Sequence, residues 1–120
     1  MKLLDLKYFT KEELICNCGC DELIVNYGFI TKIEELREFL GFSFIVNSFY
    51  RCEKYNKEVG GVKNSYHLLG RAMDIQASGE KAYKIVQHAS DFGFRGIGVY
   101  PTFIHLDDRE QDRICFWVNK

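Results

Sequence analysis

The chain carries the sequence SYHLLGRAMD at Ser65–Asp74, and we expect the fold to be organised around this stretch. It contains His67 and Asp74, and a second stretch, FIHLD at residues 103–107, adds His105. Two imidazoles and one carboxylate are the protein ligands of many catalytic zinc sites, where water takes the remaining position. The functional hypothesis therefore depends on whether these three side chains meet in the fold.

The residues around these ligands predict a loop followed by strands. A helix would place His67 and Asp74 on one face, but Gly70 falls between them, which favours a loop that leads into a strand. Asp74 would then project from the strand, and His67 would reach across from the loop. His105 and Asp107 are two residues apart in an apolar run, so a strand places both on the same face.

Two amphipathic helices are predicted from apolar residues that recur with the helical period. The first spans about residues 28–40 and the second about residues 79–92. Gly41 and Gly93 follow them as C-terminal stops, and Ser78 can cap the second. The predicted inner faces consist of Ile30, Ile33, Leu36, Phe39 and Leu40 in the first helix, and of Ala82, Ile85, Val86, Ala89 and Phe92 in the second.

The remaining segments predict short helices and strands. Thr10 and Glu13 form the capping-box pattern of a short helical turn, and residues 53–59 favour another short helix. Runs rich in β-branched and aromatic residues predict strands near residues 42–50, 71–75, 96–100, 102–106 and 114–118. This order has no βαβ rhythm. The predicted class is therefore α+β, with an antiparallel sheet covered by helices mainly on one face and a single domain over residues 1–120.

Composition and charge favour a folded chain and exclude several classes of partner. Apolar residues make up 47% of the 120 residues and aromatic residues 15%, enough for one core of ordinary size. The 16 basic and 17 acidic residues form no long run of either sign, so we expect no nucleic-acid or membrane surface. The mixed signs of residues 107–113 indicate a solvated turn. We expect a monomer.

No targeting segment is expected at the N-terminus. Residues 1–7, MKLLDLK, are short and interrupted by charge, unlike the apolar core of a signal peptide. No apolar run approaches the length needed to span a bilayer. The sequence therefore predicts a protein that is cytoplasmic as synthesised and that reaches other compartments only if something releases it.

The five cysteines fall into a cluster and two separate residues. Cys16, Cys18 and Cys20 alternate in CNCGC, whereas Cys52 and Cys115 stand apart. An odd count without a secretion signal argues against a disulfide framework, and the spacing differs from the two-residue gap of common zinc knuckles. Reduced thiols are the favoured interpretation. A small structural metal clip stays open, as does a thiol- or metal-handling protein with a second bound metal.

Spacing alone leaves simpler interpretations of the ligand residues open. A lone histidine in an apolar segment is more often a hydrogen-bonded core residue than a ligand, and Asp74 could be a turn or cap carboxylate. His88 lies beside the apolar stripe of the second predicted helix and illustrates the simple case of a partly exposed histidine. The zinc site is a hypothesis at this point.

Three motifs resemble those of a known peptidase family. SYHLLGRAMD at residues 65–74 is similar to the signature of the zinc D-Ala-D-Ala carboxypeptidase group of metallopeptidases. Upstream, SFYRCEKYNKEVGG at residues 48–61 resembles that group's Ser-x-Tyr-Arg segment. Downstream, GIGVYP at residues 96–101 and the FIHLD stretch resemble the closing motif of the branch found in phage endolysins and murein hydrolases. The resemblance runs from about Phe9 to the end of the chain, with the motifs in the family's order and spacing.

The resemblance implies a fold, a cofactor and a substrate class. The fold is the hedgehog/DD-peptidase-like α+β domain, in agreement with the class predicted above. The family's metal ligands fall on His67, Asp74 and His105, which would hold one Zn²⁺ per chain. The family's substrate-facing arginine falls on Arg51, which could clamp a peptide carboxylate or stabilise a developing oxyanion, although an ordinary surface ion pair stays open.

Other candidate site residues have two open interpretations each. Asn56 and Ser65 line the cleft and bind substrate, or they stabilise their own loops by side-chain-to-backbone hydrogen bonds. Well-known carboxypeptidase relatives carry the acidic general base three residues before the last histidine, where this chain has Thr102, which cannot act as a base. Asp107 is the nearest substitute. It would either act as the catalytic base or orient a ligand histidine.

The predicted function is a zinc-dependent peptidoglycan peptidase that hydrolyses an amide bond in murein stem peptides or cross-bridges, as a D,D-carboxypeptidase or an endopeptidase. The missing signal peptide fits a phage or prophage endolysin that acts on the cell wall after release. The alternative is a non-catalytic zinc-containing module on the same fold that binds the cell wall or a protein. This alternative stays open because Thr102 stands where the carboxypeptidase relatives carry the acidic base.

Overall fold

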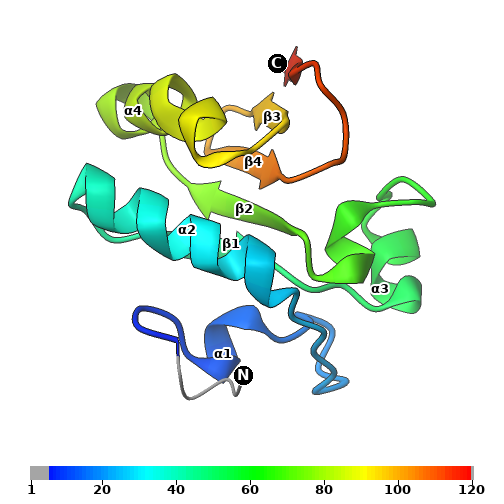
Figure 1. Cartoon of the computed structure of the whole chain (residues 1–120). Helices are drawn as coiled ribbons and strands as arrows, with labels where there is room; N and C mark the ends of the chain where they lie inside the picture. Colours follow the sequence, from blue (N-terminus) through cyan, green and yellow to red (C-terminus); the bar gives the residue numbers. More distant parts are fainter. Residues whose placement is uncertain (1–5, 120) are drawn as a thin grey trace.

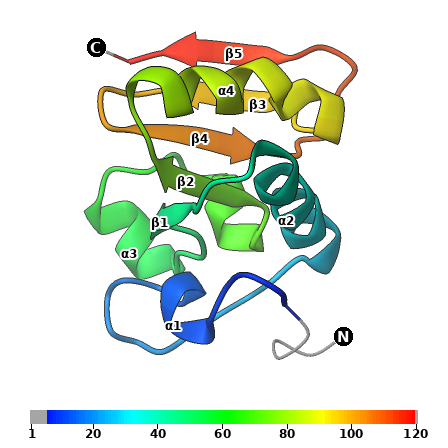
Figure 2. The same ribbon diagram turned by 90° about the vertical axis from the view of Figure 1, so that its left-hand side faces the viewer.

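The computed structural model describes residues 6–119, so the prediction about the N-terminal segment falls mostly on residues outside this range. One five-stranded sheet has the strand order β1-β2-β4-β3-β5 (Figure 2). The strands are β1 (Ile45–Ser48), β2 (Ala72–Gln76), β3 (Gly96–Val99), β4 (Phe103–Asp107) and β5 (Cys115–Val118). The helical segments are α1 (Lys11–Leu14), α2 (Tyr27–Leu40), α3 (Glu53–Glu58), the 3₁₀ turn η2 (Tyr66–Leu69), α4 (Gly79–Ala89) and the 3₁₀ turn η3 (Ser90–Phe92).

The predicted α+β class is confirmed, with one difference in the sheet. Strands β1, β2, β4 and β3 pair antiparallel in that order, but β5 pairs with β3 in parallel. Both edges of β4 are already taken by β2 and β3, so the strand that follows β4 cannot form a hairpin with it. It adds to the free edge of β3, and because it runs opposite to β4 it runs along β3.

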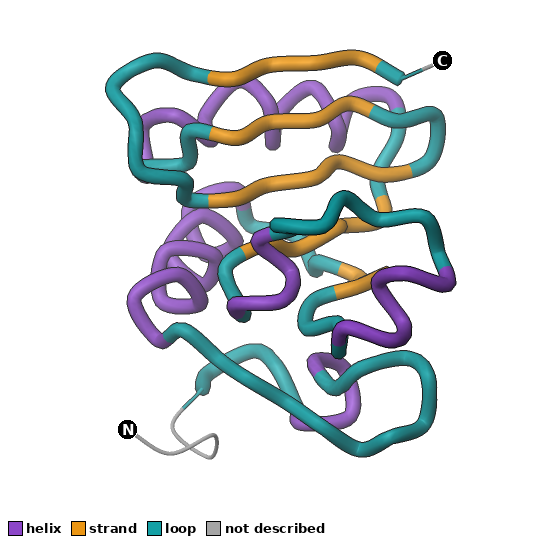
Figure 3. The backbone as a smooth tube through the Cα atoms, turned by 90° about the vertical axis from the view of Figure 1, so that its right-hand side faces the viewer, coloured by secondary structure: helices purple, strands orange, loops and turns teal. Residues whose placement is uncertain are grey.

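The two long helices and the two short helical segments lie on opposite faces of the sheet. α2 and α4 cover one face, as Figures 1 and 2 show. The view from the other side shows α3 and η2 in front of the strands, with the upper part of that face free of helices (Figure 3). This arrangement leaves the second face of β4, β3 and β5 available to form one wall of a site.

The ends of the elements follow their sequence signals at most positions. Thr10 and Glu13 form the predicted capping box, and Gly41 ends α2 in the left-handed region with φ 79°. The side chain of Asn26 accepts a hydrogen bond from the backbone N–H of Phe29 at 3.0 Å and so caps α2. Ser78 precedes α4 as predicted, but its side chain makes no capping hydrogen bond.

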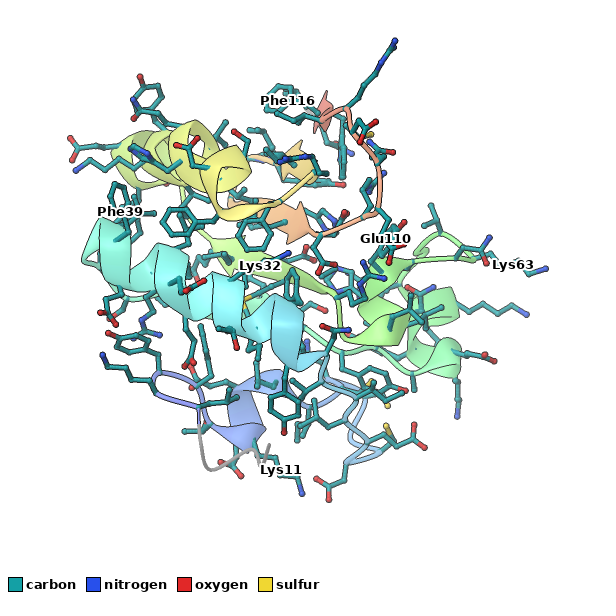
Figure 4. The ribbon with its side chains drawn as sticks, in the orientation of Figure 1. Lys11, Lys32, Phe39, Lys63, Glu110 and Phe116 are labelled. Atoms are coloured by element: carbon teal, nitrogen blue, oxygen red, sulfur yellow. The ribbon has the colours of Figure 1, made fainter. Side chains whose placement is uncertain are left out.

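The inner face of α2 differs from the predicted stripe at one aromatic residue. The buried side chains of α2 are Phe29, Ile30, Ile33 and Leu36. Phe39 is 61% exposed and lies toward α4 at the end of the helix (Figure 4), where its ring contacts those of His88 and Phe92 at centroid distances of 5.0 and 5.5 Å. Phe29, one turn before Ile33, contributes the buried ring that the prediction gave to Phe39.

Aromatic packing fixes the centre of the core between α2 and the sheet. The ring of Phe29 stacks on that of Phe49 at 6.1 Å and meets that of Phe94 edge-on at 5.6 Å. All three side chains are almost fully buried. Phe49 belongs to the segment that follows β1, so this packing also positions the backbone that leads to Arg51.

Among the described residues, no helix combines the length and the apolar character that crossing a bilayer requires.

The Phe29→Ala variant is expected to lose about 3–5 kcal/mol of unfolding free energy, because it leaves a cavity between two other buried rings. Phe116→Ala makes the same chemical change at a side chain that is 52% exposed on β5 (Figure 4), and it should change stability by less than about 0.5 kcal/mol. Urea unfolding of both variants measures the difference. Equal losses would contradict this assignment of the core.

Candidate metal centre

Strand pairing brings Asp74 and His105 together. The two residues are direct partners in the antiparallel pair of β2 and β4, so their side chains leave the sheet side by side on the same face. His67 comes from η2, which precedes β2. Ser65 caps η2 by accepting a hydrogen bond from the backbone N–H of His67 at 3.2 Å. Gly70 ends η2 with φ 66°, where a side chain would also collide with the carbonyl of Ile24.

The three predicted ligands converge on one position. Nε2 of His67 lies 3.2 Å from Oδ1 of Asp74, and Nδ1 of His105 lies 2.9 Å from the same oxygen. These donor atoms all lie within 4.8 Å of one another. His67 and Asp74 are buried and His105 is half-buried. The sequence hypothesis that the three side chains meet is therefore satisfied geometrically.

The outer nitrogens of both imidazoles are held by hydrogen-bond acceptors. Nδ1 of His67 lies 2.6 Å from the carbonyl oxygen of Phe49, and Nε2 of His105 lies 2.7 Å from Oδ2 of Asp107. A carbonyl and a carboxylate only accept, so these two nitrogens carry protons and each ring turns its other nitrogen toward Asp74. Two imidazole nitrogens and a carboxylate oxygen then face one another. All three are acceptors, so the arrangement is stabilised when they share a proton or a cation. This donor set fits zinc.

The electrostatics of the centre favour an ionised Asp74. Burial alone would raise the pKa of Asp74, but its contacts with the imidazoles of His105 and His67 outweigh this effect and hold that pKa well below its ordinary value. Arg51 adds a further cation, since its guanidinium lies 3.2 Å from Oδ2 of Asp74. Burial lowers the pKa of His105, yet its contacts with Asp107 and Asp74 raise the pKa above the ordinary value. A metal at Nδ1 of His105 would therefore displace a proton.

Asp107 lies behind His105 with both oxygens engaged. Its side chain is fully buried. Arg109 donates to Oδ1 at 2.8 Å and to Oδ2 at 2.7 Å, and His105 occupies Oδ2 as well. Burial raises the pKa of Asp107, but Arg109 and His105 outweigh it and hold the pKa well below its ordinary value. Gly96 leaves the space for this carboxylate, because a side chain at that position would collide with it.

Arg51 is held by three side chains beside the ligands. It donates to Ser48 Oγ, to Asn56 Oδ1 and to Asp74 Oδ2, each at 3.2 Å. Asn56 is buried, and its amide also donates to the carbonyl of Val62 at 2.9 Å. Asn56 thus fixes both its own loop and the guanidinium of Arg51.

The ligands line a cleft of about 700 Å³ on the sheet face opposite the long helices. Its lining includes Arg51, Ser65, the three candidate metal ligands and Trp117. The ring centroid of Trp117 lies 5.3 Å from that of His105. The indole also packs against the backbone of Gly98, where an added Cβ would lie 2.5 Å from it. Trp117 also donates to the hydroxyl of Tyr100 at 3.1 Å.

Sequence reasoning missed Trp117 and Arg109. The alternation along β5 was the signal for Trp117, since it turns inward while Phe116 and Val118 are exposed. The prediction of a solvated turn over residues 107–113 is wrong at its start, because Arg109 pairs with Asp107 and the largely buried carboxylate of Asp108 pairs with Arg71 at 2.8 Å. It holds at Glu110, whose side chain is 86% exposed.

Comparison with known proteins gives two matches. Residues 7–107 match the sequence profile of the family described as Peptidase M15. A segment of 50 residues is 42% identical to a protein named "Probable peptidoglycan L,D-endopeptidase MepK" from Haemophilus influenzae. This match covers 40% of the chain and 27% of that relative, so it spans little more than a quarter of the relative's length.

Without metal, the protein is expected to lose stability as the pH rises above about 6.5. The folded state raises the pKa of His105 above 6.5, so its proton stabilises the fold below that pH and the contribution disappears as the pH rises through the folded-state pKa. Urea unfolding of chelator-treated protein at a series of pH values measures this slope. His105→Asn should remove the slope and His88→Asn should keep it. The same slope in both variants would contradict the assignment.

Proposed function

The chain belongs to the peptidase M15 family, and we propose that it is a zinc-dependent peptidase that hydrolyses an amide bond in the stem peptides or cross-bridges of peptidoglycan. The observation that carries the proposal is the convergence of His67, Asp74 and His105 in the lining of a cleft. The name of the Haemophilus relative supports peptidoglycan as the substrate class and an endopeptidase as the type of enzyme.

The residues at the centre suit a hydrolytic metal. When bound, zinc supplies a Lewis acid that activates water and polarises the scissile carbonyl. Two imidazoles and one carboxylate leave a coordination position for water. His67 and His105 are oriented before any metal arrives, because the Phe49 carbonyl and the Asp107 carboxylate hold their outer nitrogens.

Arg51 is placed to act on substrate charge from beside the ligands. It lines the cleft, and its side chain is 16% exposed. Its hydrogen bonds to Ser48, Asn56 and Asp74 fix the guanidinium, so little order has to be gained when an anion binds. We assign Arg51 to the stem-peptide carboxylate or to the negative charge that develops on the attacked carbonyl. Asn56 supports Arg51, and Ser65 supports the turn that carries His67.

For Asp107, we propose orientation of His105 in preference to action as the general base. Both of its oxygens are occupied by Arg109 and His105, and its side chain is fully buried, so a water in the cleft finds no free acceptor on it. Of the described residues that line the cleft, only Asp74 and Asp107 carry a carboxylate, and both are engaged. Thr102, where relatives carry the base, is exposed in the turn before β4.

The same observation keeps a second function open. A cleft whose carboxylates are all engaged suits a zinc-containing module that binds peptidoglycan or a protein without cleaving it. Product formation from purified peptidoglycan separates this module from the enzyme, and the molecular masses of the products identify the bond that is cut.

After incubation with the protein, purified peptidoglycan is expected to contain muropeptides with shorter stem peptides or with hydrolysed cross-bridges. Mass spectrometry of the muropeptides detects both. A chelator should stop the reaction and added zinc should restore it. His67→Ala should give no product above background, because it removes a ligand. His88→Ala, which changes the histidine on α4, should retain full activity. Binding without cleavage by the zinc-loaded protein would favour the non-catalytic module.

The Asp107→Asn variant is expected to lower both zinc affinity and activity by about 10–100-fold, the usual effect of losing the partner of a ligand histidine. Zinc titration and peptidase assays measure the two quantities on the same samples. The matched control Asp112→Asn changes an exposed carboxylate in the loop that follows β4 and should have no effect. A loss of turnover with unchanged zinc affinity would identify Asp107 as the base instead.

A further inference from the structure

Four of the five cysteines meet at a position outside the cleft. Cys16, Cys18 and Cys20 lie in the loop after α1, and Cys52 immediately precedes α3. Their four sulfur atoms all lie within 4.8 Å of one another. Sulfur atoms, drawn yellow in Figure 4, gather where this loop approaches α3. Sequence spacing alone did not group Cys52 with the other three cysteines.

The distances between three of the sulfurs match those around a single metal ion, and the sulfur of Cys20 lies within 4.8 Å of them. Sγ of Cys16 lies 3.5 Å from that of Cys18 and 3.7 Å from that of Cys52, and Cys18 lies 3.7 Å from Cys52. Four thiolates at about 2.3 Å from a tetrahedral zinc are separated by about 3.8 Å along each edge. A disulfide would require about 2.05 Å, and all of these cysteines are free.

Backbone N–H groups already point at two of the sulfurs. The N–H of Cys52 donates to Sγ of Cys16 at 3.4 Å, and the N–H of Tyr55 donates to Sγ of Cys52 at 3.5 Å. Such bonds stabilise negative charge on sulfur and are the usual partners of metal-bound thiolates. These two contacts would stabilise the two buried sulfurs once a metal binds them.

Packing does not explain why the other two sulfurs join them. Residues 17–22 are all exposed and form neither helix nor strand. Gly19 with φ 89° and Asp21 with φ 62° turn the chain so that Cys18 and Cys20 come back toward Cys16. Hydrogen bonds from Cys16 N–H to the Glu22 carbonyl at 3.1 Å and from the Asn17 amide to the Asn47 carbonyl at 2.9 Å hold this loop. The exposed residues between them pack against no apolar surface that would gather the sulfurs, whereas a common ligand would gather them.

We propose that Cys16, Cys18, Cys20 and Cys52 bind a second zinc ion in a closed four-sulfur site with a structural role. Four protein ligands leave no position for water, which distinguishes such a site from a hydrolytic centre. The ion would fasten the loop after α1 to the backbone of Cys52, next to Arg51. The expected content of the protein is then two zinc ions per chain, one in each site.

Elemental analysis of dialysed protein tests the proposal, with variants that remove one site at a time. The wild type should hold two zinc ions per chain, and the double variant His67→Ala, His105→Ala should hold one. The double variant Cys18→Ser, Cys20→Ser should also hold one. The matched control Cys115→Ser changes the cysteine outside the group and should hold two. Loss of peptidase activity in the histidine variant with one zinc retained shows that the cysteine site binds its ion independently of the proposed catalytic centre.

Cobalt gives a second readout that does not require the cysteine variants to fold. The histidine double variant loaded with Co²⁺ should show the intense near-ultraviolet charge-transfer band of cobalt–thiolate bonds, and a mercurial thiol reagent should release one zinc from the wild type. The proposal fails if the histidine variant holds no zinc and shows no such band. It also fails if the four thiols titrate freely in the native protein, form a disulfide, or hold iron in place of zinc.

Discussion

The structure depends on one buried carboxylate, Asp74, and on the groups that face it. Burying a carboxylate without partners is strongly unfavourable. Here Oδ1 faces two imidazoles and Oδ2 faces the guanidinium of Arg51. These partners come from three separate segments, namely η2, β4 and the chain after β1. Any arrangement that satisfies Asp74 therefore also assembles the centre, so the polar core and the candidate active site are the same set of contacts.

Strand register is what delivers this arrangement. Asp74 pairs directly with His105 across β2 and β4, and a slip of one residue would turn one of them to the face covered by the helices. The neighbouring strand β3 contributes through two glycines, which have no side chains. Gly96 leaves room for Asp107 and Gly98 leaves room for Trp117, and a side chain at either position would collide with its neighbour. The face of the sheet is thus shaped around two side chains that contact His105.

The sequence predicted the parts of this protein that depend on local pattern. Most of the helices and strands follow from periodicity and caps, and the structure agrees with them. The three candidate ligands follow from motif spacing, and the structure brings their side chains together. Apart from the exposed Phe39 and the missing cap at Ser78, the failures depend on contacts between distant segments. β5 pairs in parallel because the free edge of β3 was the edge open to it. Arg109 is partly buried because it forms an ion pair with Asp107, the carboxylate that contacts His105. Cys52 lies beside the other three cysteines in the fold but stands apart from them in the sequence, so their spacing did not predict the group.

The four residues from Phe49 to Cys52 connect the candidate metal centre with the cysteine group. The carbonyl of Phe49 holds His67, the side chain of Arg51 holds Asp74, and the backbone N–H of Arg51 donates to the carbonyl of His67 at 3.2 Å. Cys52 then turns its sulfur away from the cleft toward Cys16. A small domain has limited apolar surface with which to fix an irregular loop, and a bound metal is one of the common substitutes. An ion bound by the cysteines would fix residues 49–52 at Cys52, on the side away from the cleft. The positions of His67 and Arg51 would then depend on a site that does not contact substrate.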